Sequence, residues 1–264
     1  RHSLDQWRDE KRLLRGEIRV SGWLAGMPDR IIFNSVRAAR QHERLGYPET
    51  KVLVIPNGFD LEKFSPNTAR RASVRVQLHI EPDAVVLGMI ARYHPLKDHA
   101  NFLRAARVIA GGCSGVRFVL VGRGITAENR VLTDIIRELG LGDRVLLLGE
   151  RDDVPDLLNA CDVYVSSSSS EAFPNAVGEA MSCGISCVVT NAGDSAELVA
   201  DTGIVVPPKS PERLAEAVLQ LIRAGADRRR ELGAAARERI RLNYSNKKIA
   251  QQYADLYRSV CVRA

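Results

Sequence analysis

Residues 84–122 read AVVLGMIARYHPLKDHANFLRAARVIAGGCSGVRFVLVG, and this stretch decides the fold class. It opens with an apolar, β-branched run over Ala84–Ala91 and closes with a second such run over Val116–Gly122. Between the two runs, His99–Ala110 has the length and the pattern of a helix. Two buried strands separated by a helix indicate parallel strands in an α/β protein.

The same alternation continues on both sides of this stretch. The further candidate strands are Arg30–Ser35, Lys51–Pro56, Arg144–Gly149, Asp162–Ser166, Ser186–Thr190 and Gly203–Val206. Candidate helices lie between most of them, among them Ala127–Leu139 and Pro174–Cys183. The pattern predicts a Rossmann-like parallel sheet with helices on both faces. Ligands bind such sheets beyond the carboxyl ends of the strands, so we expect functional residues just after each strand.

Turn signals divide the chain near residue 60. Pro56–Asp60 and Ser65–Asn67 are rich in Pro, Asn and Gly and predict a hinge. Most candidate strands follow the hinge, and too few precede it for an independent core. We therefore expect residues 1–66 to be the tail of an N-terminal domain with its hinge, residues 67–245 to be one Rossmann-like domain, and residues 246–264 to form a last helix. The chain begins without Met, which favours a fragment.

The composition is that of a globular protein, with 45% hydrophobic and 27% charged residues. A net charge of +6 suits anionic ligands. The basic residues are scattered and aromatic residues make up only 5%, which disfavours a nucleic-acid partner. An odd count of 5 cysteines favours reduced thiols in the cytoplasm. No apolar run is long enough to span a membrane.

Two cations follow the strand predicted over Ala84–Ala91. Arg92 and Lys97 stand between that strand and the next predicted helix. The planar fork of an arginine and the point charge of a lysine together suit a diphosphate. The alternative is that both are surface cations, one of them paired with Asp98.

Two carboxylates flank the helix predicted to begin at Pro174. The first-turn N–H groups around Asn175 and Ala176 are expected to face the strand ends, where they would attract a phosphate. Glu179 lies one turn beyond Asn175 on the same face, and Glu171 can reach the same cleft from the loop. Carboxylates fit beside a phosphate if the ligand also carries hydroxyl groups, as a sugar nucleotide does. The alternative is ordinary helix-surface and helix-start charges.

Other loops carry weaker signals. Gly122-Arg123-Gly124 lacks the third glycine of the dinucleotide fingerprint, and we interpret it as a tight turn lining the cleft. Asp152-Asp153 could bind a divalent metal, but such a pair more often caps the following helix. Cys183 and Cys187 have no His or Cys clustered beside them. The sequence therefore predicts no metal site.

Together these residues resemble family 4 of the retaining glycosyltransferases (glycosyl transferases group 1), which have the GT-B fold. The shared features are Asn57–Asp60, Arg92 with Lys97, Gly122–Gly124, the Glu-x7-Glu block from Glu171 to Glu179, Asp194–Glu197, and Thr202-Gly203 with Pro207. The resemblance extends from about residue 30 to residue 245, and residues 1–66 resemble the end of the family's acceptor domain. It implies that the chain is the C-terminal, donor-binding portion with a remnant of the N-terminal domain.

The resemblance implies transfer of a sugar from a nucleotide-diphosphate sugar with retention at the anomeric carbon. Arg92 and Lys97 would hold the diphosphate and stabilise the leaving group, and Glu171 would bond the donor sugar. Glu179 would bond the ribose hydroxyls. The other implied donor-binding residues are Gly122 in the cleft, Arg151 and Val154 beside the base, and Phe173, Pro174, Asn175 and Ala176 through their backbone. The leaving phosphate helps to deprotonate the acceptor, so neither a protein nucleophile nor a metal or other cofactor is implied.

The implied partners are a UDP- or GDP-linked sugar, a saccharide or lipid-linked acceptor, and the missing N-terminal domain. Arg1–Ser3 and Lys97–His99 resemble members that build bacterial surface polysaccharides, which would place the enzyme in the cytoplasm, at the inner face of the membrane. The last helix would cross back to the N-terminal domain, and its apolar residues are expected to be exposed and to promote dimers: Ile249, Tyr253, Leu256 and Tyr257. Two other functions stay open, a sugar-nucleotide epimerase and a non-catalytic domain that binds nucleotide sugars.

Overall fold

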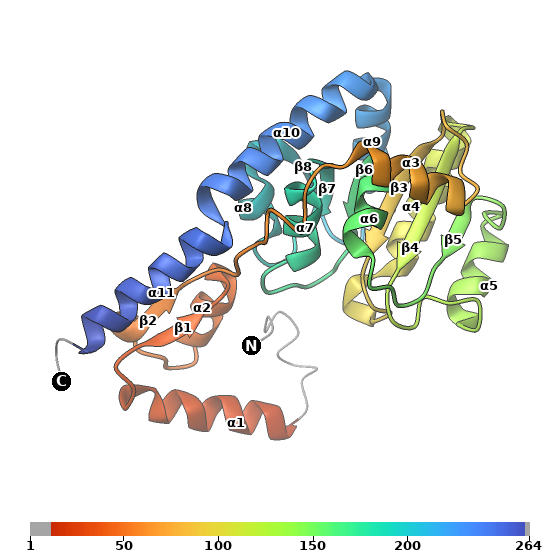
Figure 1. The fold of residues 1–264 in the computed structure, drawn as a ribbon. Coiled ribbons are helices and arrows are strands. Elements are labelled where there is room, and N and C mark those ends of the chain that lie inside the picture. The colour runs from red at the N-terminus through yellow and green to blue at the C-terminus, as the bar shows by residue number, and fades with distance from the viewer. Residues whose placement is uncertain (1–11, 262–264) are drawn as a thin grey trace.

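The computed structural model describes residues 12–261 and shows two lobes of unequal size (Figure 1). The strands are β1 Ile31–Phe33, β2 Val52–Val54, β3 Val85–Ile90, β4 Val116–Val121, β5 Val145–Leu147, β6 Val163–Ser166, β7 Ser186–Thr190 and β8 Gly203–Val206. The α-helices are α1 Arg12–Trp23, α2 Val36–Glu43, α3 Thr68–Gln77, α4 His99–Gly112, α5 Arg130–Glu138, α6 Val154–Ala160, α7 Asn175–Ser182, α8 Ser195–Val199, α9 Pro211–Arg223, α10 Gly225–Asn243 and α11 Asn246–Cys261. Every strand predicted from the sequence is present, several of them trimmed at their ends.

The large lobe is a 6-stranded parallel sheet in the order β5-β4-β3-β6-β7-β8. If the strands of this sheet are numbered from 1 at β3, the order is the 3-2-1-4-5-6 order of a Rossmann-like, doubly wound sheet. The winding reverses between β3 and β6, which pair directly through Leu87 and Val163. The predicted fold class is confirmed, and the reversal marks where such a sheet binds its ligand.

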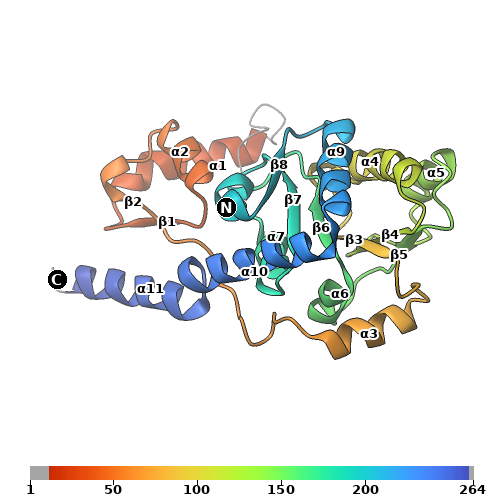
Figure 2. The same ribbon diagram turned by 90° about the horizontal axis from the view of Figure 1, so that it is seen from above.

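Helices cover both faces of this sheet, as Figure 2 shows from above. Alternate strand residues point to opposite faces, because side chains in a strand have a period of two. Val86 of β3 packs with residues of α6, α7 and α10. Its neighbour Leu87 packs on the other face with residues of α4, α5 and α9. Both faces are therefore apolar, which explains the nearly continuous apolar runs in the sequence.

The small lobe pairs β1 with β2 in a 2-stranded parallel sheet that packs with α1 and α2. The chain passes between the lobes twice, and the two crossings lie side by side. The N–H of Phe59 donates to the carbonyl of Tyr244 at 2.8 Å, and the N–H of Asn246 donates to the carbonyl of Phe59 at 3.0 Å. The linker also packs tightly on α7, since a Cβ at Gly178 would lie 2.0 Å from the Phe59 ring. The turn signals thus mark a crossing held on two sides.

The last helix, α11, runs from the large lobe alongside the small one (Figure 1). Its Ile249 and Leu256 are buried in one cluster with Ile55, which follows β2. The expectation that this apolar face is exposed is therefore wrong for these two residues, because the small lobe itself covers them. Tyr257 is 61% exposed, and residues 262–264 of the predicted helix lie outside the described residues.

The residues before α3 and α9 are both of a type that favours the start of a helix. Asn67 is not only a turn residue, because its side chain accepts from the N–H of Arg70 at 2.9 Å and caps α3, a helix that the sequence reading did not separate from the hinge. Ser210 stands at the N-cap of α9, yet its side chain makes no capping hydrogen bond. The residue type identifies where a helix begins more reliably than it identifies the hydrogen bond made there.

Candidate functional site

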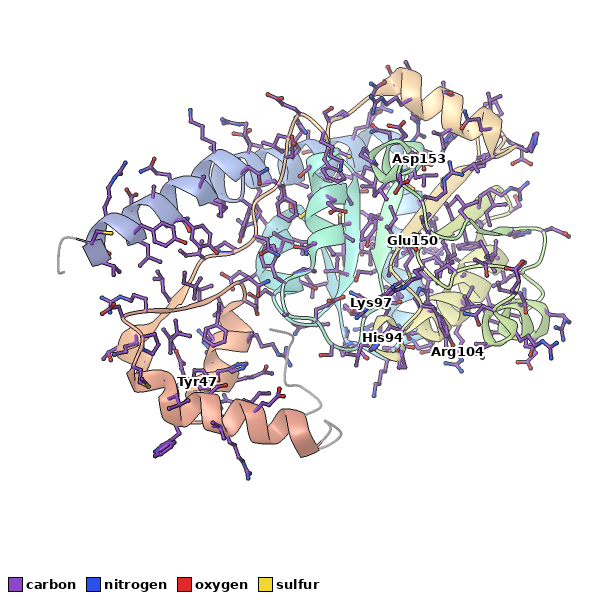
Figure 3. The ribbon with its side chains drawn as sticks, turned by 60° about the horizontal axis from the view of Figure 1, so that its bottom comes forward. Tyr47, His94, Lys97, Arg104, Glu150 and Asp153 are labelled. Carbon is purple, nitrogen blue, oxygen red and sulfur yellow. The ribbon has the colours of Figure 1, made fainter. Side chains whose placement is uncertain are left out.

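The loops after β3 and β6 meet at the point where the winding reverses. The N–H of Ser169 donates to the carbonyl of Leu96 at 2.8 Å. The hydroxyl of Ser167 donates to the carbonyls of Lys97 and Asp98 at 2.9 and 3.0 Å. The run of serines, Ser166–Ser170, is therefore a tight loop that is hydrogen-bonded to the loop carrying the two cations. Figure 3 shows His94 and Lys97 after β3 and Glu150 and Asp153 after β5, all from the carboxyl edge of the sheet.

Lys97 and Glu171 form an ion pair at this crevice. The Lys97 Nζ contacts Glu171 Oε1, and the hydroxyl of Ser168 donates to the same oxygen at 2.7 Å. Both charged side chains are shielded, with 26% of Lys97 and 13% of Glu171 exposed. The sequence placed these residues in one cleft but assigned them to different parts of a ligand. In the free chain they neutralise each other.

Arg92 is exposed and forms no ion pair with a carboxylate among residues 12–261. Gly122 backs the loop that carries it, because a Cβ there would lie 2.3 Å from the Ala91 carbonyl oxygen and 2.8 Å from the Arg92 nitrogen. Gly122 also has a φ of 147°, so a side chain at this position would displace the Arg92 backbone. Burial lowers the pKa of nearby His99 to about 4, so its imidazole adds no charge at neutral pH. Arg92 is therefore an available cation on this loop.

The start of α7 borders the same crevice. Pro174, Asn175 and Ala176 line a small hollow together with Lys97 and Glu171. Pro174 is the N-cap residue, so the helix begins one residue later than expected. Asn175 is held by the linker, whose Asn57 donates to its side-chain oxygen at 2.8 Å. These contacts bring three of the predicted donor-binding residues beside the ion pair.

Phe173 points away from that hollow. Its ring lies 6.1 Å from the Phe59 ring and 6.0 Å from the Tyr244 ring, centroid to centroid, and the residue is buried. The side chain thus joins the linker and the second crossing to the large lobe. The ring is therefore used in packing, and the predicted role of Phe173 through its backbone stays a prediction.

Glu179 lies in α7 and is partly buried, and the positive charge of Lys63 in the linker acts on its carboxyl group. Burial raises the pKa of its carboxyl to about 7, and the charge of Lys63 opposes the rise. Among residues 12–261 the carboxyl has no hydrogen-bond or ion-pair partner. A half-buried carboxyl without a donor can be stabilised by hydroxyl groups of a ligand.

Arg151 and Asp153 form a bidentate pair after β5, with Arg151 Nε and Nη2 donating at 2.8 and 2.6 Å. Asp153 is the N-cap residue of α6 but makes no capping hydrogen bond. The expectation that this acidic pair caps the helix is therefore wrong for Asp153, since Arg151 occupies its carboxylate. Val154 opens α6 and packs against the core. Arg151 remains 40% exposed, and it does not line the hollow that contains the Lys97–Glu171 ion pair.

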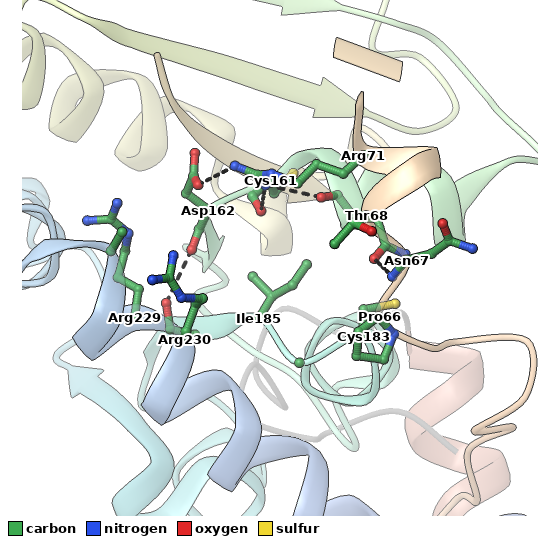
Figure 4. A pocket seen from close by; sticks show the side chains of 14 residues that line it. Pro66, Asn67, Thr68, Arg71, Cys161, Asp162, Cys183, Ile185, Arg229 and Arg230 are labelled. Atoms are coloured by element: carbon green, nitrogen blue, oxygen red, sulfur yellow. Dashed lines mark hydrogen bonds and ion pairs between the residues drawn. The ribbon is translucent and has the colours of Figure 1, made fainter. Parts of the chain in front are cut away.

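A hollow lined by several arginines lies at the opposite edge of the sheet (Figure 4). It measures about 310 Å³, and its lining includes Arg71, Arg229, Arg230 and Asp162. Arg71 pairs with Asp162 at 2.6 Å, and Arg229 donates to the Leu221 carbonyl at 3.1 Å. These cations already have partners, and the hollow lies at the end of the sheet away from the crevice.

Residues 12–261 contain no group of three or more His, Cys, Asp or Glu side chains that could hold a metal ion. In the same range no helix combines the length and the apolarity needed to cross a membrane. The five cysteines are free thiols, and burial raises the pKa of Cys183 to about 12.

The sequence did not predict the contacts that three residues make in this region. Ser168, which holds Glu171, is one of several consecutive serines and has no distinguishing neighbour. Lys63, which influences Glu179, lies in the hinge far from α7 in sequence. Asn57 belongs to a motif that was noted, but its contact with Asn175 could be seen only in three dimensions.

The strand order defines a doubly wound α/β protein, and the crevice at its switch point is the candidate ligand site. The chain belongs to the glycosyl transferases group 1, whose family model matches residues 84–224. A second model, Glycosyltransferase Family 4, matches residues 1–63. The resemblance inferred from the motifs is thereby confirmed.

Several relatives are named glycosyltransferases. The chain is 37% identical over 143 residues to the UDP-Gal:alpha-D-GlcNAc-diphosphoundecaprenol alpha-1,3-galactosyltransferase of Escherichia coli, covering 53% of this chain and 37% of the relative. It is 31% identical over 243 residues to the D-inositol 3-phosphate glycosyltransferase of Saccharomonospora viridis, covering 87% of this chain and 55% of the relative. The chain thus spans about half the length, or less, of these relatives.

The structure is similar to that of Anabaena Alr3699/HepE in complex with UDP and glucose. The TM-score is 0.86 at 27% identity, and the match covers 93% of this chain and 67% of HepE. Sucrose-phosphate synthase from Thermosynechococcus elongatus has the same fold, with a TM-score of 0.83 at 24% identity over 98% of this chain and 66% of the synthase.

Proposed function

We propose that this chain carries the donor half of a retaining glycosyltransferase that uses a nucleotide-diphosphate sugar. The observation that carries the proposal is the crevice at the switch point, where Lys97, Glu171 and the start of α7 meet. Family membership supports it, as does the similarity to HepE, whose structure holds UDP and glucose. The name of the Escherichia coli relative includes a diphosphoundecaprenol-linked acceptor, which supports a lipid-linked acceptor here. A saccharide acceptor and a role in bacterial surface polysaccharide synthesis belong to the same proposal.

The donor's diphosphate takes the place of Glu171 at Lys97. A diphosphate offers more negative charge than one carboxylate, and exposed Arg92 adds a second cation from the same loop. Glu171, released from Lys97, accepts hydrogen bonds from the hydroxyls of the donor sugar. Glu179 accepts from the ribose hydroxyls, which supply the donors its carboxyl lacks. Val154 and Arg151 lie at the rim after β5, on the side of the base.

The transfer needs no nucleophile from the protein. The bond between the anomeric carbon and the diphosphate oxygen breaks, and the acceptor oxygen bonds to the same face of that carbon. The acceptor proton goes to the leaving phosphate. Lys97 and Arg92 stabilise the charge that develops on the leaving group. Neither a metal nor another cofactor enters these steps.

The domain division belongs to the same proposal. Residues 1–66 are the tail of an acceptor domain with its hinge, and residues 67–245 are the donor domain. Residues 246–264 are the last segment, whose helix α11 (Asn246–Cys261) returns to the acceptor side. The separate β1–β2 sheet and the packing of α11 on Ile55 support this division. A lipid-linked acceptor would place the enzyme at the inner face of the membrane.

Calorimetric titration of the chain with UDP, GDP and ADP, with and without Mg²⁺, tests the donor site. We expect one nucleotide to bind without Mg²⁺. R92A/K97A is expected to weaken that binding at least about a hundredfold, since two charge-assisted contacts of about 1.5–3 kcal/mol each are lost. The matched control is R104A/R107A, which removes two exposed arginines of α4.

Equal nucleotide affinity in R92A/K97A and in the unaltered chain would contradict the donor-site assignment. R92A alone guards against misfolding, because Arg92 is exposed and its loss breaks no internal ion pair. Formation of a new sugar epimer from a bound nucleotide sugar, with no acceptor added, would instead identify an epimerase.

A further inference from the structure

A second polar pocket lies between α2 of the small lobe and the loop that leads into α8 of the large lobe. Its volume is about 460 Å³, within the range of about 300–1,000 Å³ typical of small-molecule sites. Arg37 and Arg40 of α2 and Arg44, the residue that follows the helix, line one wall, and Gly193, Ala196 and Glu197 line the other. Positions 37, 40 and 44 are spaced by three and four, so they share one face of the helix. The wall is thus a stripe of guanidinium groups.

One carboxylate that lines this pocket, that of Asp194, already accepts three hydrogen bonds. Asp194 accepts from the Ser35 hydroxyl at 3.0 Å, from the Val36 N–H at 2.7 Å and from the Arg37 N–H at 3.0 Å. These contacts neutralise the start of α2 with the charge of Asp194. Among residues 12–261, Glu197 is then the one other acidic residue lining the pocket, and it is exposed. Arg40 and Arg44 form no ion pair with a carboxylate among residues 12–261, so these two side chains give the pocket a positive charge.

The pocket borders the loop that carries Glu171. A Cβ at Gly193 would lie 2.4 Å from the Ala172 carbonyl oxygen and 2.6 Å from that of Glu171. The N–H of Asp194 also donates to the Ala172 carbonyl at 3.0 Å. The large-lobe wall of the pocket is thus in direct contact with the backbone of the residue that the proposed function assigns to the donor sugar. The opposite wall comes from the other lobe.

We propose that this pocket binds a phosphate group carried by the acceptor, with Arg40 and Arg44 as its main ligands. Guanidinium forks match phosphate oxygens in a bidentate way, and a stripe of them favours an anion over a neutral sugar. Its place beside the donor-sugar loop and across the lobe boundary puts it on the acceptor side of the reaction. This inference rests on the proposed function and adds the substrate class to it.

The test uses inorganic phosphate on the chain saturated with UDP, so that the donor's phosphate site is filled. Calorimetry at low ionic strength is expected to show saturable phosphate binding in the unaltered chain. R40A/R44A is expected to lose at least about tenfold in affinity, while R104A/R107A stays within about twofold. Both variants should bind UDP like the unaltered chain, because neither pair lies in the donor crevice.

Absence of phosphate binding by the UDP-saturated chain would overturn the inference, as would equal phosphate affinity in R40A/R44A. Failure of UDP itself to bind would contradict the proposed function instead, so the two failures are distinguishable. A further arm identifies the source of the phosphate. Capture by phosphatidic acid vesicles that R40A/R44A abolishes assigns the site to a lipid-borne acceptor. Binding of glucose 1-phosphate without vesicle capture assigns it to a soluble one.

Discussion

Glu171 and Glu179 carry the same carboxyl group into two different environments. Glu171 is held by the Lys97 ammonium and the Ser168 hydroxyl. Glu179 is partly buried without such donors, and its pKa is raised to about 7. Burial without compensation disfavours the charged form, whereas a cation favours it. The Lys97–Glu171 pair can therefore exchange partners when a diphosphate binds, and Glu179 can accept hydrogen bonds from the hydroxyl groups of a ligand.

The raised pKa of Glu179 predicts a pH-dependent stability. The unfolded chain releases this proton near 4.5 and the folded chain near 7. Stability from this group is therefore complete below about 4.5 and is lost as the pH rises toward 7, by up to about 3 kcal/mol at about 1.36 kcal/mol per pKa unit. Urea unfolding of the unaltered chain and of E179Q over pH 4.5–8 measures the difference. A constant difference across that range would contradict the raised pKa.

The main site residues could be predicted because their positions follow from the strands. Arg92, Lys97 and Glu171 each come just after a strand that the apolar pattern identifies, and Glu179 follows by helical spacing. The pairing of Arg151 with Asp153 could not be predicted. It depends on the conformation of one loop, and neither residue type nor spacing selects it over a helix cap.

At the scale of whole elements, the two edges of the large sheet have different roles, one in the candidate site and one in stability. The carboxyl edge carries the crevice. The opposite edge carries a buried ion cluster, in which Asp162 accepts from Arg71 and Arg75 at 2.6 Å each and from the Val86 N–H at 2.7 Å. It ties α3 to the starts of β3 and β6, and we expect it to support the fold rather than to bind ligand.

D162N is expected to lower the free energy of unfolding by about 3–5 kcal/mol, because it leaves buried Arg75 without its counter-charge. UDP affinity should stay within about twofold, since the cluster lies at the far edge of the sheet. The control is D156N, which breaks the more exposed pair with Arg70 and should cost less than about 1 kcal/mol. Chemical denaturation and calorimetry give both readouts. Equal losses in the two variants would contradict the structural role of Asp162.

The elements of the large lobe followed from periodicity, but their contacts with the linker did not. The apolar runs gave the strands because both faces of the sheet are covered. The start of α3 was hidden, because Asn67 is equally a turn residue and a helix cap. The burial of Ile249 and Leu256 depends on where α11 meets Ile55, a contact between residues far apart in the chain.

At the scale of the molecule, the proposed reaction takes place at the boundary between the two lobes. The chain crosses it at Phe59 and again at Tyr244–Asn246, and Asp194 of the large lobe holds the start of α2. The donor crevice and the pocket beside α2, which Arg40 and Arg44 line, both border the loop that carries Glu171. A sugar bound at that loop would therefore face a phosphate bound on the small lobe.

A crystal structure of the chain with UDP tests the central claim most directly. We predict the diphosphate between Arg92 and Lys97, the Lys97–Glu171 pair broken, and the ribose hydroxyls donating to Glu179, with no metal between phosphate and protein. UDP bound at the hollow beside Arg71 and Arg229, or bound with the Lys97–Glu171 pair intact and its phosphates away from both cations, would contradict the account.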